Sequence, residues 1–377
     1  MSVLITGATG FLGCRILGGL LAQETDAITV LGRGTPAELR ERVEAALSGA
    51  GLLPTAPDAL DRLRFVSADL TSPGLGLSET DRDHVTEDLT AVWHCAAYLN
   101  LQGDPVSLYR ANVLGTREVL ALADKAPAAH LLFISTAYVA GCRRTGHVME
   151  DELTEEYGFQ TYYEETKHTA ERMIHSWARR TGRTATILRP SLLATDQPIP
   201  EGQPHQPLAV FARLVDDLVR VRTAEDEALV NLLSEDGFHG SALHFRVKGD
   251  PEGTLNLIQV DHAARAMVRA AASPPRTGVR TVHVTHPHNT TFDSAASAFE
   301  ALYQGVNVTV TPTLAHPTPF EALAASHGAD LLTFTMHRRT YDRTNLLRIA
   351  GDLPDPDPID SAYLARALGC VMEPSPA

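Results

Sequence analysis

Lysine is nearly absent from this sequence. Only Lys125, Lys167 and Lys248 occur, so arginine supplies almost all of the 32 basic side chains, which face 46 acidic ones. The formal net charge is −14, and the chain has no long run of basic residues. A surface of this sign repels polyanions, which argues against nucleic acid or an anionic membrane as the main partner.

Cysteine is scarce as well, and no Cys-x-x-Cys spacing is present. The chain has four cysteines that lie far apart, namely Cys14, Cys95, Cys142 and Cys370. The first two lie inside apolar segments. We therefore expect reduced, buried thiols of a cytoplasmic protein rather than structural disulfides.

Long apolar runs are also missing. The opening stretch VLITGATGFLGCRILGGLLA has no basic segment before it and no small-residue cleavage site, and glycines interrupt its apolar run. It is therefore a poor secretion signal. No uninterrupted apolar segment reaches the roughly 18 residues that a membrane-spanning helix needs. We expect a soluble chain in the cytoplasm.

Apolar residues make up 44% of the 377 positions, enough to bury the core of one large domain or of a large and a smaller one. Short apolar runs alternate with segments of helical periodicity over the first half. This alternation predicts an α/β fold with a Rossmann-type, doubly wound parallel sheet. The expected strands are SVLIT, AITVL, LRFVSAD, AVWHCAA, HLLFIST and TATILRP, and the expected helices cover about 11–23, 37–48, 105–125 and 161–180.

The texture of the sequence changes after Pro190. A loop rich in Pro and Gln, TDQPIPEGQPHQP, leaves the sheet, and helices are expected around 210–221 and 226–233. The stretch GTLNLIQVDHAARAMVRAAA predicts a strand and an amphipathic helix that return to the main domain, and TVHVTH predicts a late strand. We therefore expect a cofactor-binding domain over 1–195, with contributions from about 254–286. The remaining pieces, 196–253 and 287–377, would form a smaller, discontinuous substrate-binding region over the strand ends.

A glycine-rich turn separates the first strand from the first helix. In TGATGFLG, Gly7 allows a tight turn, Gly10 lets the backbone approach a pyrophosphate, and Gly13 lets helix and strand pack closely. The free N–H groups of the helix start favour phosphate. This stretch predicts a dinucleotide site, with the following contacts: Gly7, Thr9, Gly10, Phe11, Leu12 and Gly13.

The residue after the second strand indicates which dinucleotide binds. NAD sites usually carry a carboxylate there for the ribose 2′-hydroxyl, but VLGRG places Arg33 at this position. A guanidinium would pair with a 2′-phosphate, so NADP(H) is the expected cofactor. The alternative is a solvated Arg33 with NAD tolerated. Asp69 is placed to accept from the adenine amino group or, alternatively, to cap the next segment.

The stretch YYEETKHTAERM carries the strongest chemical signal. Tyr163 and Lys167 are four apart on an expected helix and share a face. An ammonium beside a phenol lowers the pKa of the phenol and makes it a usable proton donor. The same lysine can hold the ribose hydroxyls of the nicotinamide. Tyr162 is the competing phenol, but it is four residues from Thr166, which has no charge to offer.

Two further polar positions accompany this pair. Ser135 and Thr136 end the strand LLFIST at the carboxyl edge of the sheet, where a hydroxyl can bind a substrate carbonyl oxygen. We favour Thr136, with Ser135, or a capping role for both, as the alternative. Asn112 interrupts an apolar helix face in YRANVLGTREVL. It would relay protons through water towards Lys167 or be a satisfied buried amide.

Several other polar residues carry weaker signals. His283, His286 and His288 lack a supporting carboxylate or cysteine, so we expect ordinary surface and turn histidines and no metal site. Arg143 and Arg144 would dock an acidic carrier protein or simply be solvated, and the second interpretation is favoured.

Taken together, these motifs resemble the extended short-chain dehydrogenases/reductases over about residues 2–195. The matching segments are the glycine turn, Asp69, HCAA at 94–97, Asn112, STAYVAG, the Tyr163–Lys167 pair and LRPS at 188–191. The resemblance adds Leu70, Ala96 and Pro190 to the expected cofactor contacts. It also implies that RTYDRTN (339–345) returns towards the substrate cleft, which leaves contacts of Tyr341 or Arg343 with substrate open.

Within that superfamily, TGATGFLG, STAYVAG and YEETKHTAE most resemble thioester reductase domains and fatty acyl-CoA reductases. This branch implies hydride transfer from NADPH to an acyl thioester, with Thr136 and Tyr163 holding the carbonyl oxygen. Because the glycine-turn strand begins almost at Met1, we expect the thioester to arrive on a separate carrier protein or on coenzyme A. Homodimers through paired helices are common in the superfamily.

Other activities share most of these motifs. Dehydratases place an Asp-Glu pair after the threonine, whereas Ala137 and Tyr138 follow Thr136 here. Reductases or dehydrogenases of free ketones or aldehydes and nucleotide-sugar epimerases remain alternatives, although epimerases often prefer NAD. A non-catalytic NADP-sensing protein would be expected to have lost the Tyr163–Lys167 pair.

Overall fold

The computed structural model describes residues 2–23, 27–56, 58–100, 103–199, 243–303, 306–318, 321–322 and 336–372. The helices expected at 210–221 and 226–233 lie outside these ranges. Cys14, Cys95 and Cys142 are free thiols, as expected. Within the described ranges, no helix combines the length and the apolar character that crossing a bilayer requires.

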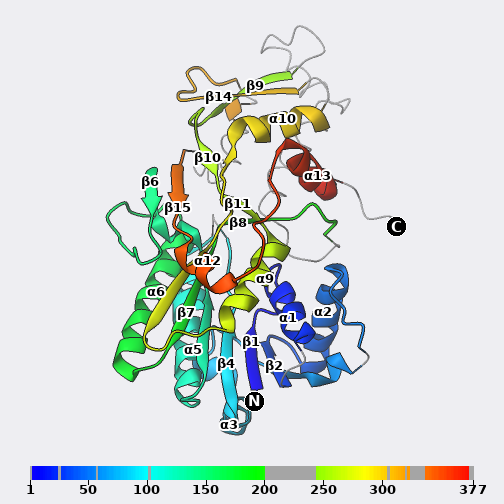
Figure 1. Ribbon diagram of the computed structural model, residues 1–377, viewed down its shortest axis with the longest axis vertical. Helices are drawn as coiled ribbons and strands as arrows, with labels where there is room; N and C mark the ends of the chain where they lie inside the picture. The colour runs from blue at the N-terminus through cyan, green and yellow to red at the C-terminus, as the bar shows by residue number, and fades with distance from the viewer. Residues whose placement is uncertain are drawn as a thin grey trace.

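A seven-stranded sheet forms the centre of the molecule, and every pair of neighbouring strands is parallel (Figure 1). The strand order across the sheet is β12-β7-β5-β4-β1-β2-β3. The chain therefore begins in the interior with β1, continues through β2 to β3 at one edge, and then adds the other four strands on the opposite side of β1. The expected doubly wound sheet is confirmed. The strands are β1 (Ser2–Thr6), β2 (Ala27–Gly32), β3 (Leu63–Ser67), β4 (Leu89–His94), β5 (His130–Ile134), β7 (Ala185–Pro190) and β12 (Val279–Val284).

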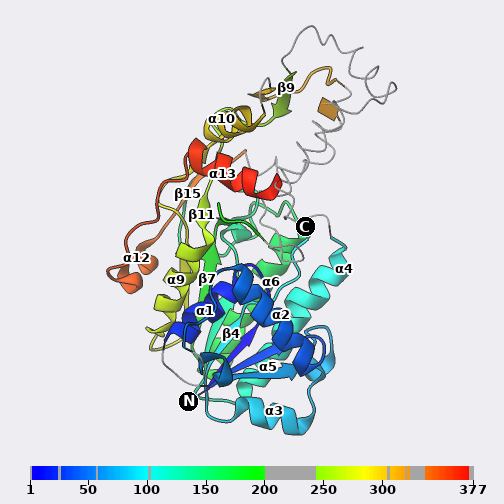
Figure 2. The same cartoon turned by 90° about the vertical axis from the view of Figure 1, so that its right-hand side faces the viewer.

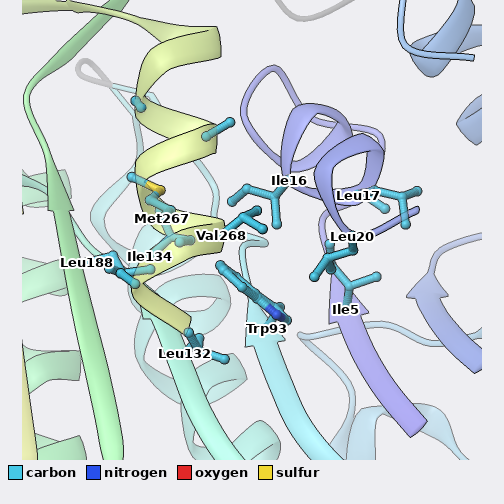
Figure 3. Close-up of a cluster of buried hydrophobic side chains, with 14 of the residues drawn as sticks. Ile5, Ile16, Leu17, Leu20, Trp93, Leu132, Ile134, Leu188, Met267 and Val268 are labelled. Atoms are coloured by element: carbon cyan, nitrogen blue, oxygen red, sulfur yellow. The ribbon is translucent and has the colours of Figure 1, made fainter. Parts of the chain in front are cut away.

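Successive side chains of each strand point to opposite faces of the sheet. In β5, Leu131 and Phe133 enter one buried cluster, whereas Leu132 and Ile134 enter the other. Figure 3 shows the second of these, where Trp93 lies between the sheet and two helices. Because both faces are covered, the strands are apolar almost throughout, which explains the uninterrupted runs in the sequence.

Helices cover the two faces in two groups (Figures 1 and 2). One face carries α1 (Gly13–Ala22), α2 (Pro36–Gly49), α9 (Val260–Ala271) and α12 (Thr344–Ala350). The other carries α3 (Glu79–Thr86), α5 (Gly115–Asp124) and α6 (Tyr162–Thr181). The start of α6 is fixed by Thr161, whose hydroxyl accepts the amide of Glu164, and its end by Gly182 in the left-handed conformation.

The helix expected over 105–125 is present, but its middle is π-helical. It consists of α4 (Pro105–Leu108), a π-helical segment η3 (Tyr109–Leu114) and α5. The Thr116 hydroxyl donates to the carbonyl of Asn112 at 2.6 Å, in the widened turn. Such π segments occur frequently at functional sites, and this one contains the expected site residue Asn112.

A third buried cluster lies in the part of the molecule beyond the carboxyl ends of the strands (Figure 2). It joins Ala194 and Leu257 to Phe299, Tyr363 and Leu368. Besides the short strands that carry Ala194 and Leu257, the elements that contribute are β9 (Leu243–Lys248), β14 (Val306–Thr311), α10 (Phe292–Leu302) and α13 (Ser361–Met372). This core is built from segments far apart in the chain.

Short ladders and turns complete the described fold. Parallel pairs join β8 (Leu192–Ala194) to β11 (Leu257–Gln259) and β6 (Thr145–Val148) to β15 (Arg338–Tyr341). An antiparallel pair joins β10 (Thr254–Leu255) to β13 (Thr290–Thr291). The 3₁₀ turns are η1 (Ala59–Arg62), η2 (Pro73–Gly76) and η4 (Ala137–Ala140).

Candidate active site

The residues predicted to bind cofactor and substrate follow the ends of the central strands. Because all these strands are parallel, their carboxyl ends meet at one edge of the sheet. The glycine turn follows β1, Arg33 follows β2, Asp69 and Leu70 follow β3, Ala96 follows β4, Thr136 follows β5, and Pro190 ends β7.

The glycine turn folds tightly against the loop after β4. Gly7 has a φ of 75°, and a Cβ atom there would lie 2.6 Å from the backbone nitrogen of Ala96. A Cβ atom on Gly13 would lie 2.0 Å from the carbonyl oxygen of Gly7. The Gly10 amide donates to the same oxygen at 3.0 Å. The crossing of strand, turn and helix therefore requires glycine at positions 7 and 13.

The start of α1 offers unpaired donors. Its N-cap, Leu12, supplies no side-chain cap. Within the described part of the chain, the amides of Phe11, Leu12 and Gly13 have no backbone acceptor. Exposed N–H groups at a helix N-terminus attract anionic oxygens, so this cradle fits a pyrophosphate.

Sequence reasoning missed the arginine that fixes this turn. Arg15 is 9% exposed, and its Nη1 donates to the carbonyl of Phe11 at 2.7 Å. Its Nε donates to Asp261 on α9 at 2.8 Å. A basic residue in the apolar stretch GCRILGGLLA was the only available signal, and its partner lies 246 positions away.

Arg33 is exposed after β2, and no hydrogen bond is recorded for its guanidinium among the described residues, although its charge acts on Asp69. Arg42, which the sequence analysis did not single out, donates through Nη2 to the Arg33 carbonyl. Two guanidinium groups therefore lie near the predicted 2′-phosphate position.

Asp69 performs the capping role that was the alternative for it. Its carboxylate accepts from the Thr71 amide at 2.9 Å and from the hydroxyls of Thr71 and Ser72. The hydrogen bonds from Thr71, together with nearby Arg33, lower the pKa of Asp69. Its predicted adenine contact stays a prediction. Leu70 packs where η3 meets α5, since a Cβ atom on Gly115 would lie 2.9 Å from the Leu70 Cβ.

The two hydroxyls after β5 have different surroundings. Ser135 donates to Glu171, a fully buried carboxylate that also receives Arg189 Nη2 at 2.7 Å. Thr136 Oγ1 accepts the Tyr138 amide at 3.2 Å and caps η4. The Ser135 proton is therefore used inside the protein, whereas no acceptor is recorded for that of Thr136 in the described ranges.

Lys167 is 2% exposed and reaches the end of β5. Its Nζ donates to the carbonyl of Ile134 at 2.6 Å and lies 4.4 Å from the centroid of the Phe133 ring. Burial lowers the pKa of Lys167 to about 8, although Glu171 and Cys95 oppose the change. The lysine thus fixes the face of α6 that carries Tyr163 against the strand end.

The predicted lowering of the Tyr163 pKa is not what the structure has. Burial raises this pKa, and the neighbouring Glu164 carboxylate adds to the rise. The reason is geometric, because the Lys167 ammonium is directed to the Ile134 carbonyl rather than to the phenol. The phenol is consequently held in its protonated form.

Asn112 is a satisfied buried amide in this arrangement. Its Oδ1 accepts the Tyr98 amide at 2.8 Å, and its Nδ2 donates to the Tyr98 carbonyl and to Thr166 Oγ1, each at 3.1 Å. These bonds tie the loop after β4 to α6. The interpretation favoured from the sequence, a water relay towards Lys167, stays a prediction.

The histidine prediction was partly wrong. His283 and His286 are buried rather than at the surface, and only His288 is exposed. His283 Nδ1 lies 2.9 Å from the Asp342 carbonyl oxygen, and Nε2 lies 3.3 Å from Arg189. No group of three metal-binding side chains occurs among the residues that the structure describes.

The basic pair after η4 is also only half solvated. Arg143 is held by the carboxylate of Glu152 and the carbonyls of Thr145 and His147, whereas Arg144 is exposed. Farther along the chain, Tyr341 is buried, and Arg343 pairs with Asp355 at 2.8 Å.

Comparison with known proteins identifies the family. A family profile described as male sterility protein matches residues 5–267. The L-2-aminoadipate reductase large subunit of Penicillium chrysogenum is 29% identical over 324 residues, which cover 81% of this chain and 21% of that protein. Fatty acyl-CoA reductase 1 of Homo sapiens is 34% identical over 150 residues, or 38% of this chain and 29% of that protein. The chain thus spans less than a third of either relative.

Solved structures share the whole architecture. The terminal R domain from the myxalamid PKS-NRPS pathway aligns over 98% of this chain and 89% of its own, with a TM-score of 0.74 and 25% identity. UDP-glucuronic acid 4-epimerase from Bacillus cereus covers 98% and 96%, with a TM-score of 0.64 and 19% identity, and shares the fold. The chain belongs to the male sterility protein family, an oxidoreductase branch of the extended short-chain dehydrogenases/reductases.

Proposed function

We propose that this chain is an NADPH-dependent reductase of acyl thioesters bound to a carrier protein or to coenzyme A. The product would be an aldehyde or, after a second reduction, an alcohol. The observation that supports the proposal is the anchoring of Lys167, four residues after Tyr163 on α6, at the end of β5, where Thr136 follows. Lys167 is bonded to Ile134, the residue just before the Ser135-Thr136 pair. The names of the relatives, fatty acyl-CoA reductase and aminoadipate reductase, support the same chemistry.

The residues at the carboxyl edge fit a dinucleotide. The cradle formed by Gly7, Gly10 and Gly13 leaves no room for a Cβ atom at two of its positions, and the amides at the start of α1 have no backbone acceptor among the described residues. Arg33 and Arg42 supply positive charge that suits a 2′-phosphate, which favours NADPH over NADH. The remaining contacts proposed are Thr9, Phe11, Leu12, Asp69, Leu70, Ala96, Lys167 and Pro190.

Bound NADPH would supply a hydride to the thioester carbon. The Thr136 hydroxyl donates a hydrogen bond to the carbonyl oxygen, because its oxygen already accepts the Tyr138 amide and its proton is left to donate. Tyr163 provides the proton that the developing alkoxide takes up, which gives a hemithioacetal. Cleavage of its C–S bond then yields the aldehyde, and the hydroxyl proton leaves with the sulfur as the free thiol of the carrier protein or of coenzyme A. Lys167 positions the nicotinamide ribose, and Asn112 holds the adjoining loop against α6.

A division of labour along the chain accompanies this chemistry. We propose that residues 1–195 with about 254–286 bind the cofactor, and that 196–253 and 287–377 bind the acyl group. The separate buried cluster around Phe299 and Tyr363, beyond the strand ends, supports this division. The acyl group would be presented by a carrier protein, since a solved structure of similar fold, from an archaeal non-ribosomal peptide synthetase, joins a thiolation domain to a reductase domain.

The test is NADPH consumption with acyl-coenzyme A, acyl-carrier protein, free ketone and sugar-nucleotide substrates. We expect turnover of a thioester. Turnover confined to sugar nucleotides or to free ketones would contradict the proposal. Tyr163→Phe should abolish turnover and leave NADPH binding intact. The matched change in the exposed neighbour, Tyr162→Phe, should leave both turnover and NADPH binding intact. Retained turnover in Tyr163→Phe would place the proton donor elsewhere.

A further inference from the structure

A buried arginine from the C-terminal strand β15 lies against the turn that carries Thr136. Arg339 is 2% exposed, although its neighbours on either side in the sequence face outward. Its Nη1 donates to the carbonyls of Gly141 at 2.6 Å and Arg143 at 3.0 Å. Its Nε donates to the Tyr341 hydroxyl at 2.8 Å. A segment almost 200 positions away therefore holds the end of η4.

The turn itself is short and closed at both ends. Thr136 caps its start by accepting the Tyr138 amide, and the Gly141 amide donates to the Tyr138 carbonyl at 2.9 Å. Gly141 has a φ of 59°, and a Cβ atom there would lie 1.9 Å from the Gly158 carbonyl oxygen. The position of Thr136 is thus linked to that of Gly141, whose carbonyl Arg339 holds.

The same arginine lies near a buried carboxylate next to the proton donor. Glu164 is 1% exposed, and its Oε2 accepts the Gln160 amide at 2.9 Å. Within the described part of the chain, Glu164 Oε1 and Arg339 Nη2 are both buried without a hydrogen-bond partner. Burial raises the pKa of Glu164 to about 7, and the charge of Arg339 opposes that rise. A buried acceptor and a buried donor of opposite charge thus interact electrostatically although neither atom has a hydrogen-bond partner among the described residues.

The titratable groups around Glu164 come from four segments. They are Tyr163 on α6, Tyr138 on η4, Cys142 after it, and Arg339 and Tyr341 on β15. His337, which precedes β15, lies 3.4 Å from the Gln160 side chain. Arg339 is the positive charge recorded as acting on Glu164 among these groups.

We infer that Arg339 is a positioning residue for the reduction proposed above, on which this inference rests. It fixes the turn that presents the Thr136 hydroxyl, and it supplies the counter-charge to Glu164 beside Tyr163. Region 337–341 is therefore part of the active-site framework, although it lies far from the cofactor-binding half of the sequence.

Two consequences follow for catalysis. When the hydrogen bonds of the Arg339 guanidinium to the Gly141 and Arg143 carbonyls are lost, Thr136 moves relative to the substrate oxygen. The value of kcat then falls by a larger factor than KM rises. The Glu164 charge disfavours a phenolate at Tyr163, and a reductase needs the protonated phenol as donor. Removing that charge lets Tyr163 lose its proton at a lower pH. The alkaline limb of the activity profile then moves down.

The first experiment compares Arg339→Met and Arg339→Lys with Arg338→Met as the matched control. Arg338 is adjacent but exposed and pairs with Asp250 and Glu252. We expect Arg339→Met to lower kcat about tenfold or more, with KM within about threefold and NADPH affinity unchanged. Arg339→Lys keeps the positive charge but removes the paired N–H donors of the guanidinium. The value of kcat should therefore fall, while the alkaline limb of the pH–activity profile stays in place. Hydrogen exchange of amides 138–141 should accelerate in both Arg339 variants and not in the control.

The second experiment measures the pH profile of Glu164→Gln against Glu165→Gln, which removes the same charge from an exposed position one residue on. We expect the alkaline limb to move down by about one pH unit in the first variant only. This variant also tests the inference if Arg339→Met fails to fold.

The inference is overturned if Arg339→Met retains wild-type kcat and wild-type exchange, or if the two glutamine variants have the same profile. Exchange is measured without substrate. Accelerated exchange in a protein that reduces no thioester would therefore support the positioning role and refute the proposed function separately.

Discussion

Which of the two hydroxyls after β5 assists the reaction can be decided by a pair of conservative substitutions. Thr136→Val keeps the shape of the side chain and removes the hydroxyl that caps η4 and that we assign to the substrate oxygen. Ser135→Ala removes the hydroxyl that donates to Glu171. We expect the first change to abolish most activity and the second to affect mainly stability.

The structure sets the magnitudes. Thr136→Val loses one capping bond, which costs about 1 kcal/mol of stability. It also loses a hydrogen bond to developing negative charge, which is worth about 3 kcal/mol, or 10²–10³-fold in kcat. In Ser135→Ala, Glu171 still receives Arg189 Nε at 3.0 Å and Nη2 at 2.7 Å. Its carboxylate therefore stays paired, and the loss is about 1 kcal/mol of stability.

The assay combines steady-state NADPH consumption with urea unfolding for each variant. The unfolding data separate a loss of folded protein from a loss of catalysis. Our reasoning would be refuted if Ser135→Ala lost 10²-fold or more in kcat while Thr136→Val stayed within about threefold of wild type. That result would make Ser135 the catalytic hydroxyl and Thr136 only a cap.

Three further predictions follow from the same structure. Arg33→Ala should weaken NADPH binding about tenfold or more relative to NADH binding, because a charge-assisted hydrogen bond to the 2′-phosphate is lost. A fluorescence titration measures both affinities, and equal weakening of the two would contradict the assignment of NADP(H) as the cofactor. Glu171→Ala leaves Arg189 buried without its carboxylate and should cost about 3–5 kcal/mol in urea unfolding, whereas a loss under 1 kcal/mol would show that the pair does not stabilise the fold. Burial lowers the pKa of His94 to about 3, below the value of about 6.5 in the unfolded chain. The unfolded chain therefore takes up a proton on His94 first as the pH falls. The contribution of neutral His94 to the free energy of unfolding is complete above about pH 6.5 and is lost as the pH falls towards about 3. His94→Gln should reduce the slope of the free energy of unfolding against pH in this window by up to about 1.4 kcal/mol per pH unit. The control His288→Gln, at an exposed histidine, should leave the slope unchanged. Identical slopes in the two variants would contradict the role given to His94.

The sheet and its edge were accessible from the sequence because each depends on local pattern. Apolar runs of strand length, glycines at three spaced positions and a Tyr-x-x-x-Lys pair on a helix need only near neighbours to be recognised. The confirmed strand sequence then places the turn after β1 and the hydroxyls after β5 at one edge, since parallel strands all end there.

The errors arose where a side chain is bonded to a distant segment. Lys167 was expected to act on Tyr163, four residues before it, but its ammonium reaches the Ile134 carbonyl of β5. His283 and His286 were expected at the surface, but β12 lies against β7, and both rings are buried.

The sequence by itself determined the alternation of strands and helices over the first half of the chain, the glycine cradle and the residue types available at the strand ends, because these depend on periodicity and steric rules over a few residues. Only the tertiary structure decided which groups are used up internally. Ser135 is bound to Glu171 on α6, and Arg339, almost 200 positions further along the chain, holds the loop after Thr136. Hydrogen bonds and desolvation act through space, so the free or engaged state of a side chain is fixed only when distant segments pack together.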